Sequence, residues 1–300
     1  QPLIPPDWKM TLRDGELYAQ VAFSAAADQG FEAGGHGVLK SGSAWMPDNQ
    51  INGVDFVLPF RFSEGTWSLG TRGPVTLRIG EVENLVTARN ITADLQGDYP
   101  WTEDNPLLLT NVKVETLGGK ITMQQLWMPQ HDPALLRVDN ISSSELISAV
   151  NPKQFAMSGP VSGALPFWLD NEKWIIKDGW LTNPGPMTLR IDKDTADAIV
   201  KDNMVAGAAI NWLRYMEISR SWTRINLDNL GELTMQATIK GTSRVDGKSS
   251  SVNLNYTHDE NVFTLWRSLR FGDNLQTWFE QHAAIPAPRS LTGKESEEQQ

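Results

Sequence analysis

Leu58-Pro59-Phe60, followed by Gly73-Pro74-Val75-Thr76-Leu77-Arg78-Ile79, returns later in the chain as Leu165-Pro166-Phe167 followed by Gly185-Pro186-Met187-Thr188-Leu189-Arg190-Ile191. A third match, Ile121-Thr122-Met123-Gln124 with Leu233-Thr234-Met235-Gln236, keeps the offset of 112 residues that separates Gly73 from Gly185. Three matched segments in the same order indicate two copies of one structural unit. Units of a fixed period usually stack into an elongated array.

Apolar and polar residues alternate with a period of two through most of the chain, which is typical of strands with one apolar and one solvated face. Turn signals such as Gly118-Gly119 and Asp246-Gly247 separate these runs. Pro59 and Pro166 occupy matched positions inside strand patterns. Since proline cannot donate to a ladder, each should lie where a strand starts, bulges or borders an edge. The sequence therefore predicts a mostly β fold built from antiparallel strands.

Helices are predicted in three places only. Residues 143–150 follow serine caps and precede Asn151-Pro152, and an apolar stripe at near four-residue spacing predicts a longer helix over residues 194–219. In the first copy, the insert at residues 81–110 predicts strands and loop instead. Residues 259–284 predict two helices joined at Gly272-Asp273.

Composition excludes several functional classes. The 300 residues carry a net charge of −10 with scattered Lys and Arg, which argues against a nucleic-acid surface. The absence of cysteine excludes disulfides, thiolate metal sites and cysteine nucleophiles. The chain begins at Gln1 without a signal sequence or transmembrane run, so we expect that it is an excised fragment and that any anchor or targeting segment lies upstream.

No pattern for catalysis, a metal or a cofactor is present in the sequence. His36, His131, His258 and His282 are far apart and begin no known ligand spacing. Asp192-Lys193-Asp194 lacks the glycine and glutamate that a calcium loop needs downstream, so a helix N-terminus is the better interpretation. We therefore expect a protein that is not an enzyme, with no catalytic residue, metal or cofactor.

The informative chemistry is the apolar face of the strands, which has two possible fates. It can close on a second sheet as a sandwich core, which patterning alone favours because packed cores are common, or it can stay open as a trough for acyl chains. The long, aromatic-rich face of the first repeat is an argument for the trough, but it does not decide between the two. The positions predicted to line such a groove are Val54, Phe56, Leu58, Phe60, Phe62, Val75, Leu77, Ile79, Met123, Met187, Leu189, Ile191, Leu233 and Met235.

The phrase from Ser158 to Phe167, then Trp174 to Leu181 and Gly185-Pro186, resembles the signature of the YdbH-like family. The segments 253–256 and 262–272 are similar to the extreme C-terminal part of that family. The matched phrases span about residues 158–271, and the upstream copy extends the likeness toward the N-terminus. The family is grouped with AsmA-like, repeating β-groove proteins of Gram-negative envelopes.

The resemblance implies an elongated, curved antiparallel sheet that forms an apolar groove and conducts phospholipids across the periplasm between the inner and outer membranes. It also implies an inner-membrane anchor upstream and a small outer-membrane lipoprotein that joins the C-terminal end by β-strand addition. The alternative is a closed β-sandwich module that docks the lipoprotein without carrying lipid. Aromatic and apolar residues of the last segment are predicted to cap the groove, line its exit, contact the partner or only cover the last strands: Phe263, Trp266, Leu269, Trp278 and Phe279.

The expected organisation has five parts. Residues 1–53 form N-terminal strands that continue the groove, and residues 54–157 and 158–258 form the first and second repeat units. Residues 259–285 form C-terminal helices, and the proline-rich and polar residues 286–300 form a disordered tail.

Overall fold

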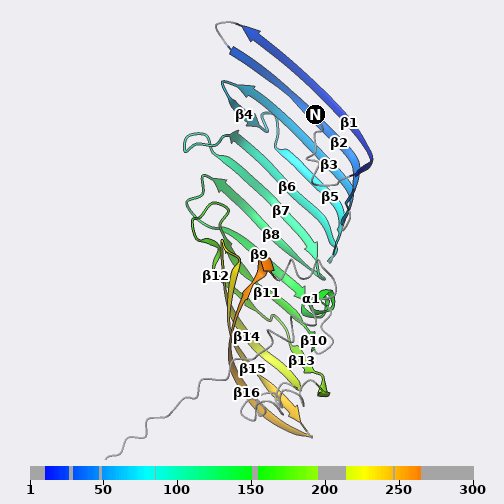
Figure 1. Cartoon of the computed structure of the whole chain (residues 1–300), viewed down its shortest axis with the longest axis vertical. Coiled ribbons are helices and arrows are strands. Elements are labelled where there is room, and N and C mark those ends of the chain that lie inside the picture. Colours follow the sequence, from blue (N-terminus) through cyan, green and yellow to red (C-terminus); the bar gives the residue numbers. More distant parts are fainter. Residues whose placement is uncertain are drawn as a thin grey trace, which may run out of the picture.

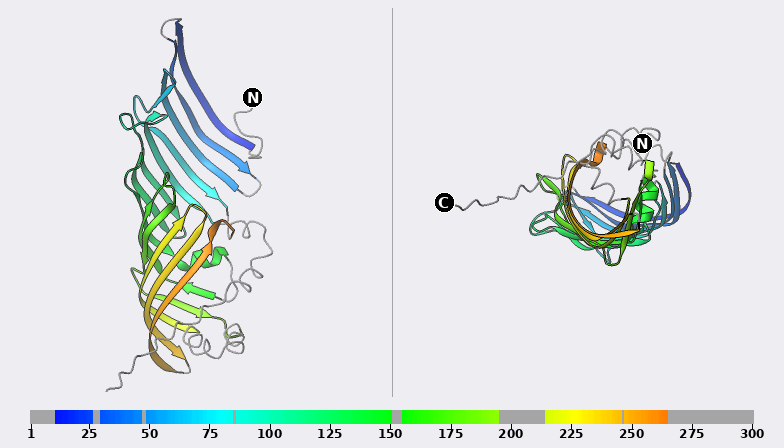
Figure 2. Two further views of the ribbon diagram at one scale, coloured as in Figure 1. Left: turned by 60° about the vertical axis from the view of Figure 1, so that its left-hand side comes forward. Right: turned by 90° about the horizontal axis from the view of Figure 1, so that it is seen from below.

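The computed structural model describes residues 11–26, 30–46, 49–84, 86–150, 155–194, 214–245 and 247–264. Their strands form one 16-stranded sheet in which every ladder between strands is antiparallel. The sheet is elongated (Figure 1) and curls about its long axis, which is clearest in the right-hand view of Figure 2. The predicted fold class, a mostly β, elongated and curved antiparallel sheet, is confirmed.

The first half of the sheet contains β1 (Thr11–Ala26), β2 (Gly30–Met46), β3 (Asn49–Ser63), β4 (Thr66–Leu69), β5 (Val75–Glu83), β6 (Ala88–Tyr99), β7 (Leu107–Thr116), β8 (Gly119–Met128) and β9 (Ala134–Ser142). Helix α1 (Ser143–Val150) follows β9. The second half contains β10 (Phe155–Ser158), β11 (Pro160–Phe167), β12 (Trp174–Thr182), β13 (Met187–Ile191), β14 (Tyr215–Asp228), β15 (Glu232–Val245) and β16 (Lys248–Asn261).

The two Gly-Pro segments of the repeat have the same structural role. Each precedes the second of two strands that pair with successive parts of the same long neighbour. Gly73-Pro74 precedes β5, and Gly185-Pro186 precedes β13. In the first copy, β3 pairs with both β4 and β5. In the second copy, β14 pairs with both β12 and β13. The repeated sequence therefore builds a long strand that is interrupted near its middle.

The copies differ in the strands that come next. In the first copy β6 and β7 lie between β5 and β8, whereas in the second copy β14 pairs directly with β13 on one side and β15 on the other. Pairing between β9 and β11 makes the sheet continuous from one copy to the next. The boundaries of the five expected parts stay a prediction.

Both repeat prolines lie where a ladder is interrupted. Pro59 lies between the part of β3 that pairs with β5 and the part that pairs with β4, and its carbonyl accepts from the Gly70 N–H at 2.8 Å. Pro166 lies inside the register shift between Ala164 and Phe167 in the β11–β12 ladder. At neither position does the interrupted ladder require a backbone N–H. The expectation that each proline lies where a strand bulges or its pairing is interrupted is therefore confirmed.

Bulges with a left-handed residue recur across the sheet. Ser41, Asn140 and Asp178 have φ between 51° and 55°, and each is the extra residue at a register shift. Their N–H groups donate to side-chain oxygens of the next strand: Ser41 to Asp55 Oδ1 at 2.9 Å, Asn140 to Ser162 Oγ at 2.9 Å, and Asp178 to Asn226 Oδ1 at 2.8 Å. A bulge bends its strand and increases the local twist, so bulges at successive positions help to roll the sheet.

Helix α1 is confirmed with the predicted bounds. The Ser142 hydroxyl accepts from the Glu145 N–H at 3.3 Å, which is an N-cap contact. The strands and loop predicted for residues 81–110 are also confirmed, because β6 and the start of β7 lie there.

The helix predicted over residues 194–219 is wrong at its C-terminal end, where β14 begins at Tyr215. Met216 and Ile218 are buried on one face of that strand. Period-two alternation from Tyr215 onward carried the correct signal, and ladders with β13 and β15 override the helical spacing. The rest of the predicted helix, residues 195–213, lies outside the described residues.

The helix predicted to begin at Asp259 is also displaced, because β16 continues to Asn261 and helical residues start at 262. Asn261 is the cap, since its Oδ1 accepts from the Thr264 N–H at 2.9 Å. The rest of that prediction, the Gly272-Asp273 junction and the tail, lies outside the described residues. None of the described helices has the length and apolar character needed to cross a membrane.

Candidate functional site: the concave face

Strand registers place the predicted groove positions of the first repeat on one face of the sheet. Val54 pairs with Ile79, Phe56 pairs with Leu77, and the row continues from Val75 to Leu95 in β6. Side chains directly opposite each other in an antiparallel pair lie on the same face. These rows therefore form a continuous apolar surface, which we call the concave face.

The same face continues through the second repeat. Met187 pairs with Ile218, Leu189 with Met216, and Met235 with Ile225. Leu233 pairs with Leu227, and Ile191 pairs with Phe155 in β10. All of these predicted positions therefore belong to paired rows of one sheet rather than to two facing sheets.

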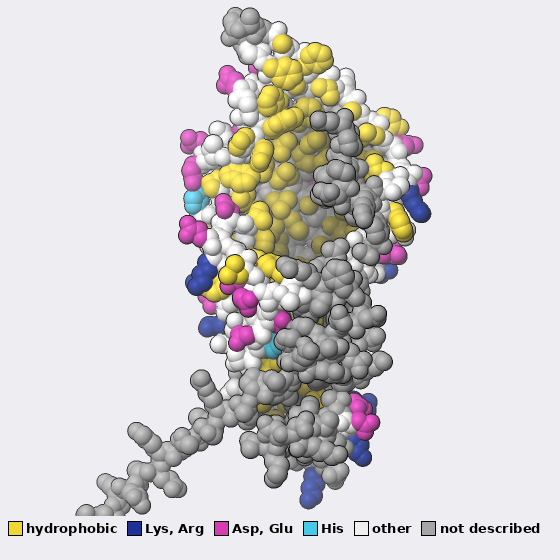
Figure 3. Space-filling view, viewed as in Figure 1, with side chains coloured by type: hydrophobic (Ala, Val, Ile, Leu, Met, Phe, Trp, Pro, Cys, Tyr) yellow, Lys and Arg dark blue, Asp and Glu magenta, His cyan; other side chains and the backbone are white. Residues whose placement is uncertain are grey.

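Burial varies along the concave face. A cluster of buried side chains in the middle of the sheet contains Leu107, Met123, Leu126, Met128 and Ala134. A second buried cluster contains Met187, Met216, Ile218 and Val252, and Leu189 packs against it. The face is far more open on β1, where Leu17 is 71% exposed and Phe23 is 76% exposed. Figure 3 shows apolar side chains gathered in an open hollow over the N-terminal strands, with acidic and basic side chains at its margins.

Aromatic rings gather where the concave face meets the turn between β3 and β4. The Phe62 and Trp67 centroids are 4.9 Å apart, those of Phe60 and Trp67 5.6 Å, and those of Phe31 and Phe62 6.0 Å. Such tilted pairs add roughly 0.5–1.5 kcal/mol beyond their buried area. They hold a large apolar surface in place although Trp67 is 43% exposed.

Glycines on the concave face lie opposite large side chains. Gly35 lies opposite Phe60, and Gly163 lies opposite Leu181. Alternation of small and large residues on an inner surface allows a sheet to curl tightly. The curvature and the apolar lining thus come from the same rows.

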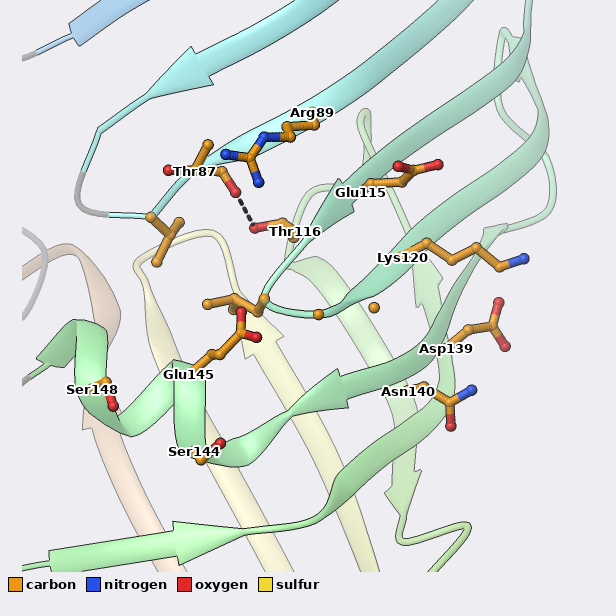
Figure 4. Close-up of a pocket in the computed structure, with 14 residues that line it drawn as sticks. Thr87, Arg89, Glu115, Thr116, Lys120, Asp139, Asn140, Ser144, Glu145 and Ser148 are labelled. Atoms are coloured by element: carbon orange, nitrogen blue, oxygen red, sulfur yellow. Dashed lines mark hydrogen bonds between the residues drawn. The ribbon is translucent and has the colours of Figure 1, made fainter.

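A pocket of about 920 Å³ lies outside this face, beside the β7–β8 turn and α1 (Figure 4). Glu115, Lys120 and Asp139 line it and alternate along their strands with Val114, Ile121 and Val138, which pair with one another in one row. Two of its charged groups have charged partners: Arg89 Nε contacts Glu81 Oε2 at 2.7 Å, and Glu115 pairs with Lys113. The pocket is therefore polar, mixed in charge and directed away from the apolar surface.

Of the residues predicted for the groove end, the structure describes only Phe263. Its side chain is 42% exposed, and its ring lies against Gly231 in the β14–β15 turn. Trp266, Leu269, Trp278 and Phe279 lie outside the described residues. Their proposed role at the groove end stays a prediction.

Several deeply buried residues of the concave face were not predicted. They include Leu107, Leu126, Met128, Ala134, Val138, Met216, Ile225 and Val252. Alternation in Leu126-Trp127-Met128 and Tyr215-Met216-Glu217-Ile218 could have identified part of this set. In the described part of the chain, no three His, Cys, Asp or Glu side chains form a group that could hold a metal.

Comparison with known proteins gives one consistent result. Residues 1–284 match the YdbH-like family, described as "Intermembrane phospholipid transport protein YdbH". The chain is 79% identical over 300 residues to a relative from Escherichia coli (strain K12) named "Probable phospholipid transport protein YdbH". That alignment covers 100% of this chain and 34% of the relative, so the chain spans about a third of the relative's length. No solved structure matches the chain.

Proposed function

The chain belongs to the YdbH-like family of intermembrane phospholipid transport proteins, and from this premise we propose that its concave face binds and conducts phospholipids. The observation that carries the proposal is the continuity of the apolar rows from β1 to β16 within one sheet. Acyl chains gain about 0.8 kcal/mol for each buried CH₂ group. A surface with continuous apolar rows therefore holds an acyl chain at many positions and lets it move between neighbouring ones.

The groove positions named from the sequence are the proposed lining. Leu77, Leu189 and Met235 are half-buried, so each packs against the sheet and still exposes apolar surface that a ligand can contact. Met187 and Ile191 are buried and serve as the floor. A groove of this kind needs no catalytic side chain and no cofactor, since transfer of a lipid makes and breaks no covalent bond.

The alternative of a closed sandwich requires a second sheet over the concave face. The described strands form a single sheet, and its apolar rows are open over the N-terminal strands (Figure 3). The exposed fractions of Leu17 and Phe23 favour a surface that receives a ligand over a packed core.

We place the chain in the periplasm of the Gram-negative envelope, as the part of a longer bridge that lies near the outer membrane. An upstream segment would anchor that bridge in the inner membrane. The word "intermembrane" in the description of the family supports the envelope location, and the 34% of the relative that the chain covers supports a longer protein. An apolar trough that continues from one membrane toward the other shields acyl chains from water over the whole path.

We propose that a small outer-membrane lipoprotein joins the sheet by strand addition. The outer edge of β16 pairs with no other described strand, and the same is true of β1. An unpaired edge presents backbone donors and acceptors to an incoming strand. A proline scan of residues 249–255 in β16 tests this: alternate positions should lose lipoprotein retention while the protein stays folded, and retention at every position would contradict strand addition.

Photocrosslinking in cells tests the groove. A photoreactive residue at Leu77, Leu189 or Met235 should capture phospholipid, whereas the same residue at Arg190 on the opposite face should not. Absence of lipid adducts at all three concave positions would contradict the proposal. In addition, Leu189→Glu or Met235→Glu should block lipid loading, and circular dichroism separates this loss from unfolding.

A further inference from the structure

The last strand carries a row of polar side chains on the otherwise apolar concave face. Tyr256 pairs with Ala237, His258 with Met235, and Glu260 with Leu233. All three therefore face the same side as the proposed lipid groove. Toward the other end of β16, the same face carries Leu254 and Val252.

The three side chains contact one another along the strand. The Tyr256 hydroxyl lies 3.1 Å from His258 Nδ1, and the two rings stack at a centroid distance of 6.0 Å. His258 Nε2 lies 3.7 Å from Glu260 Oε2, and the Glu260 side chain is only 11% exposed. In the described part of the chain, His258 is the only basic group within 4.0 Å of Glu260.

This row is chemically distinct from the rest of the face. Concave positions on the other described strands carry no charged side chain wherever the paired registers define them, and Asn49, which pairs with Met46 at the start of β3, is an amide among their apolar, aromatic, glycine, serine and threonine side chains. Keeping a carboxylate in an apolar surrounding costs free energy unless a partner compensates it. Glu260 Oε1 accepts from the Asn261 N–H at 3.0 Å, whereas among the described residues Oε2 has only the His258 ring, at 3.7 Å. This second oxygen, together with Tyr256 and His258, offers polar contacts to a ligand at this end of the groove.

We propose that Tyr256, His258 and Glu260 form a binding site for the zwitterionic headgroup of a phospholipid, an inference that rests on the proposed function. The Tyr256 hydroxyl and a His258 N–H donate to the phosphate, and Glu260 accepts from the ammonium group. The row spans about 13 Å along the strand, which is long enough to contact both the phosphate and the ammonium group of one headgroup. The acyl chains lie toward Leu254 and the buried cluster around Met216.

The gradient along β16 matches such an amphiphile. Val252 is 5% exposed and packs in the buried cluster, whereas the polar row ends beside the β14–β15 turn at the margin of the sheet. A lipid that arrives through the apolar rows would be held by its headgroup at the last strand. The row therefore provides a stop position, and it selects headgroups that carry an ammonium group.

The test is the headgroup composition of lipid that copurifies with the full-length protein. Glu260→Gln keeps the shape of the side chain and removes its charge, so the ratio of ethanolamine to glycerol headgroups should fall about fivefold. Asp259→Asn is the matched control, because Asp259 is adjacent, exposed and paired with Thr234 on the opposite face. The control should keep the composition of the unsubstituted protein.

The outcomes separate this inference from the proposed function. Lipid-free unsubstituted protein would overturn both. A normal lipid load with an unchanged headgroup ratio in Glu260→Gln would overturn the headgroup site alone. If that variant does not fold, Tyr256→Phe, which removes one hydroxyl, should still speed lipid exchange from the protein about threefold; an unchanged rate would overturn the site.

A competition experiment identifies the source of the headgroup. Excess glycerophosphoethanolamine should leave the bound lipid in place, because it lacks the acyl chains that contribute most of the binding. Displacement of the lipid by this soluble compound would show that the row binds a free phosphoester and would overturn the lipid assignment.

Discussion

Gly163 of β11 lies so close to Trp180 of β12 that a methyl group at position 163 would come within 2.0 Å of the Trp180 carbonyl oxygen. The same relationship recurs between Gly35 and Gln20, also at 2.0 Å. Real side chains do not approach a backbone oxygen this closely. The close approach of neighbouring strands, and with it the curvature of the sheet, therefore requires glycine at these positions.

Gly163→Ala should destabilise the protein, because either the methyl group or the β12 backbone must move. We expect a loss of about 1–3 kcal/mol in the free energy of unfolding, measured in denaturant. Gly37→Ala is the matched control, since an added Cβ at this strand glycine meets nothing within 4 Å. Equal stability of the two variants would contradict the steric explanation.

An ion pair between neighbouring strands should make stability depend on pH. Arg78 Nη1 lies 2.7 Å from Asp94 Oδ1 across the β5–β6 ladder. Burial opposes ionisation of Asp94, but hydrogen bonds from Arg78 and Asn111 outweigh it and hold the Asp94 pKa below its ordinary value of 3.8. The carboxylate therefore contributes stability above the unfolded-state pKa, and this contribution is lost as the pH falls below about 4.

Arg78→Gln should reduce stability at neutral pH by about 1 kcal/mol and flatten the loss of stability between about pH 5 and about pH 3. Urea unfolding at several pH values measures both effects. Arg61→Gln is a suitable comparison, because Arg61 is 3.8 Å from Glu32 and both side chains are largely exposed. An unchanged pH profile in Arg78→Gln would contradict a contribution from the Asp94 pair.

Part of this architecture could be predicted from the sequence, for a physical reason. A period of two assigns each strand residue to a face without knowledge of its partner. The sequence alone therefore assigns Phe56 and Leu77 to the groove, and their pairing puts both on one face. Pro59 and Pro166 likewise marked interruptions in the ladder, because proline lacks the donor at any position.

Long-range pairing determined what the sequence could not. The spacing that predicted a helix through Met216 was overridden by ladders on both sides of β14, which bury Met216 completely. His258 showed no ligand spacing, and its neighbours became informative only when pairing with Met235 placed it on the apolar face. Whether the concave face is open or covered by a second sheet depends on the tertiary arrangement of the strands. The period of apolar residues along one strand carries no information about that arrangement.

Two methionines of the concave face should behave differently because their burial differs. Met216 is 0% exposed, so Met216→Ala should reduce the free energy of unfolding by about 2–5 kcal/mol. Met235 is half-buried, and Met235→Glu should leave the protein folded but without bound lipid. Thermal unfolding and lipid extraction on the same samples measure both effects. Unfolding of Met235→Glu would instead support a packed core at that position.

Aromatic residues on opposite faces of the sheet provide the last comparison. Phe60 lies on the concave face next to Trp67, whereas Trp222 is 51% exposed and stacks on Trp180 at 5.0 Å on the other face. Phe60→Ser should lower the amount of copurified phospholipid, because it replaces apolar groove surface with a hydroxyl. Trp222→Ser should leave that amount unchanged, although it removes a larger aromatic ring. Mass spectrometry of extracted lipid, normalised to folded protein, distinguishes the two, and an equal loss in both variants would contradict a lipid path confined to the concave face.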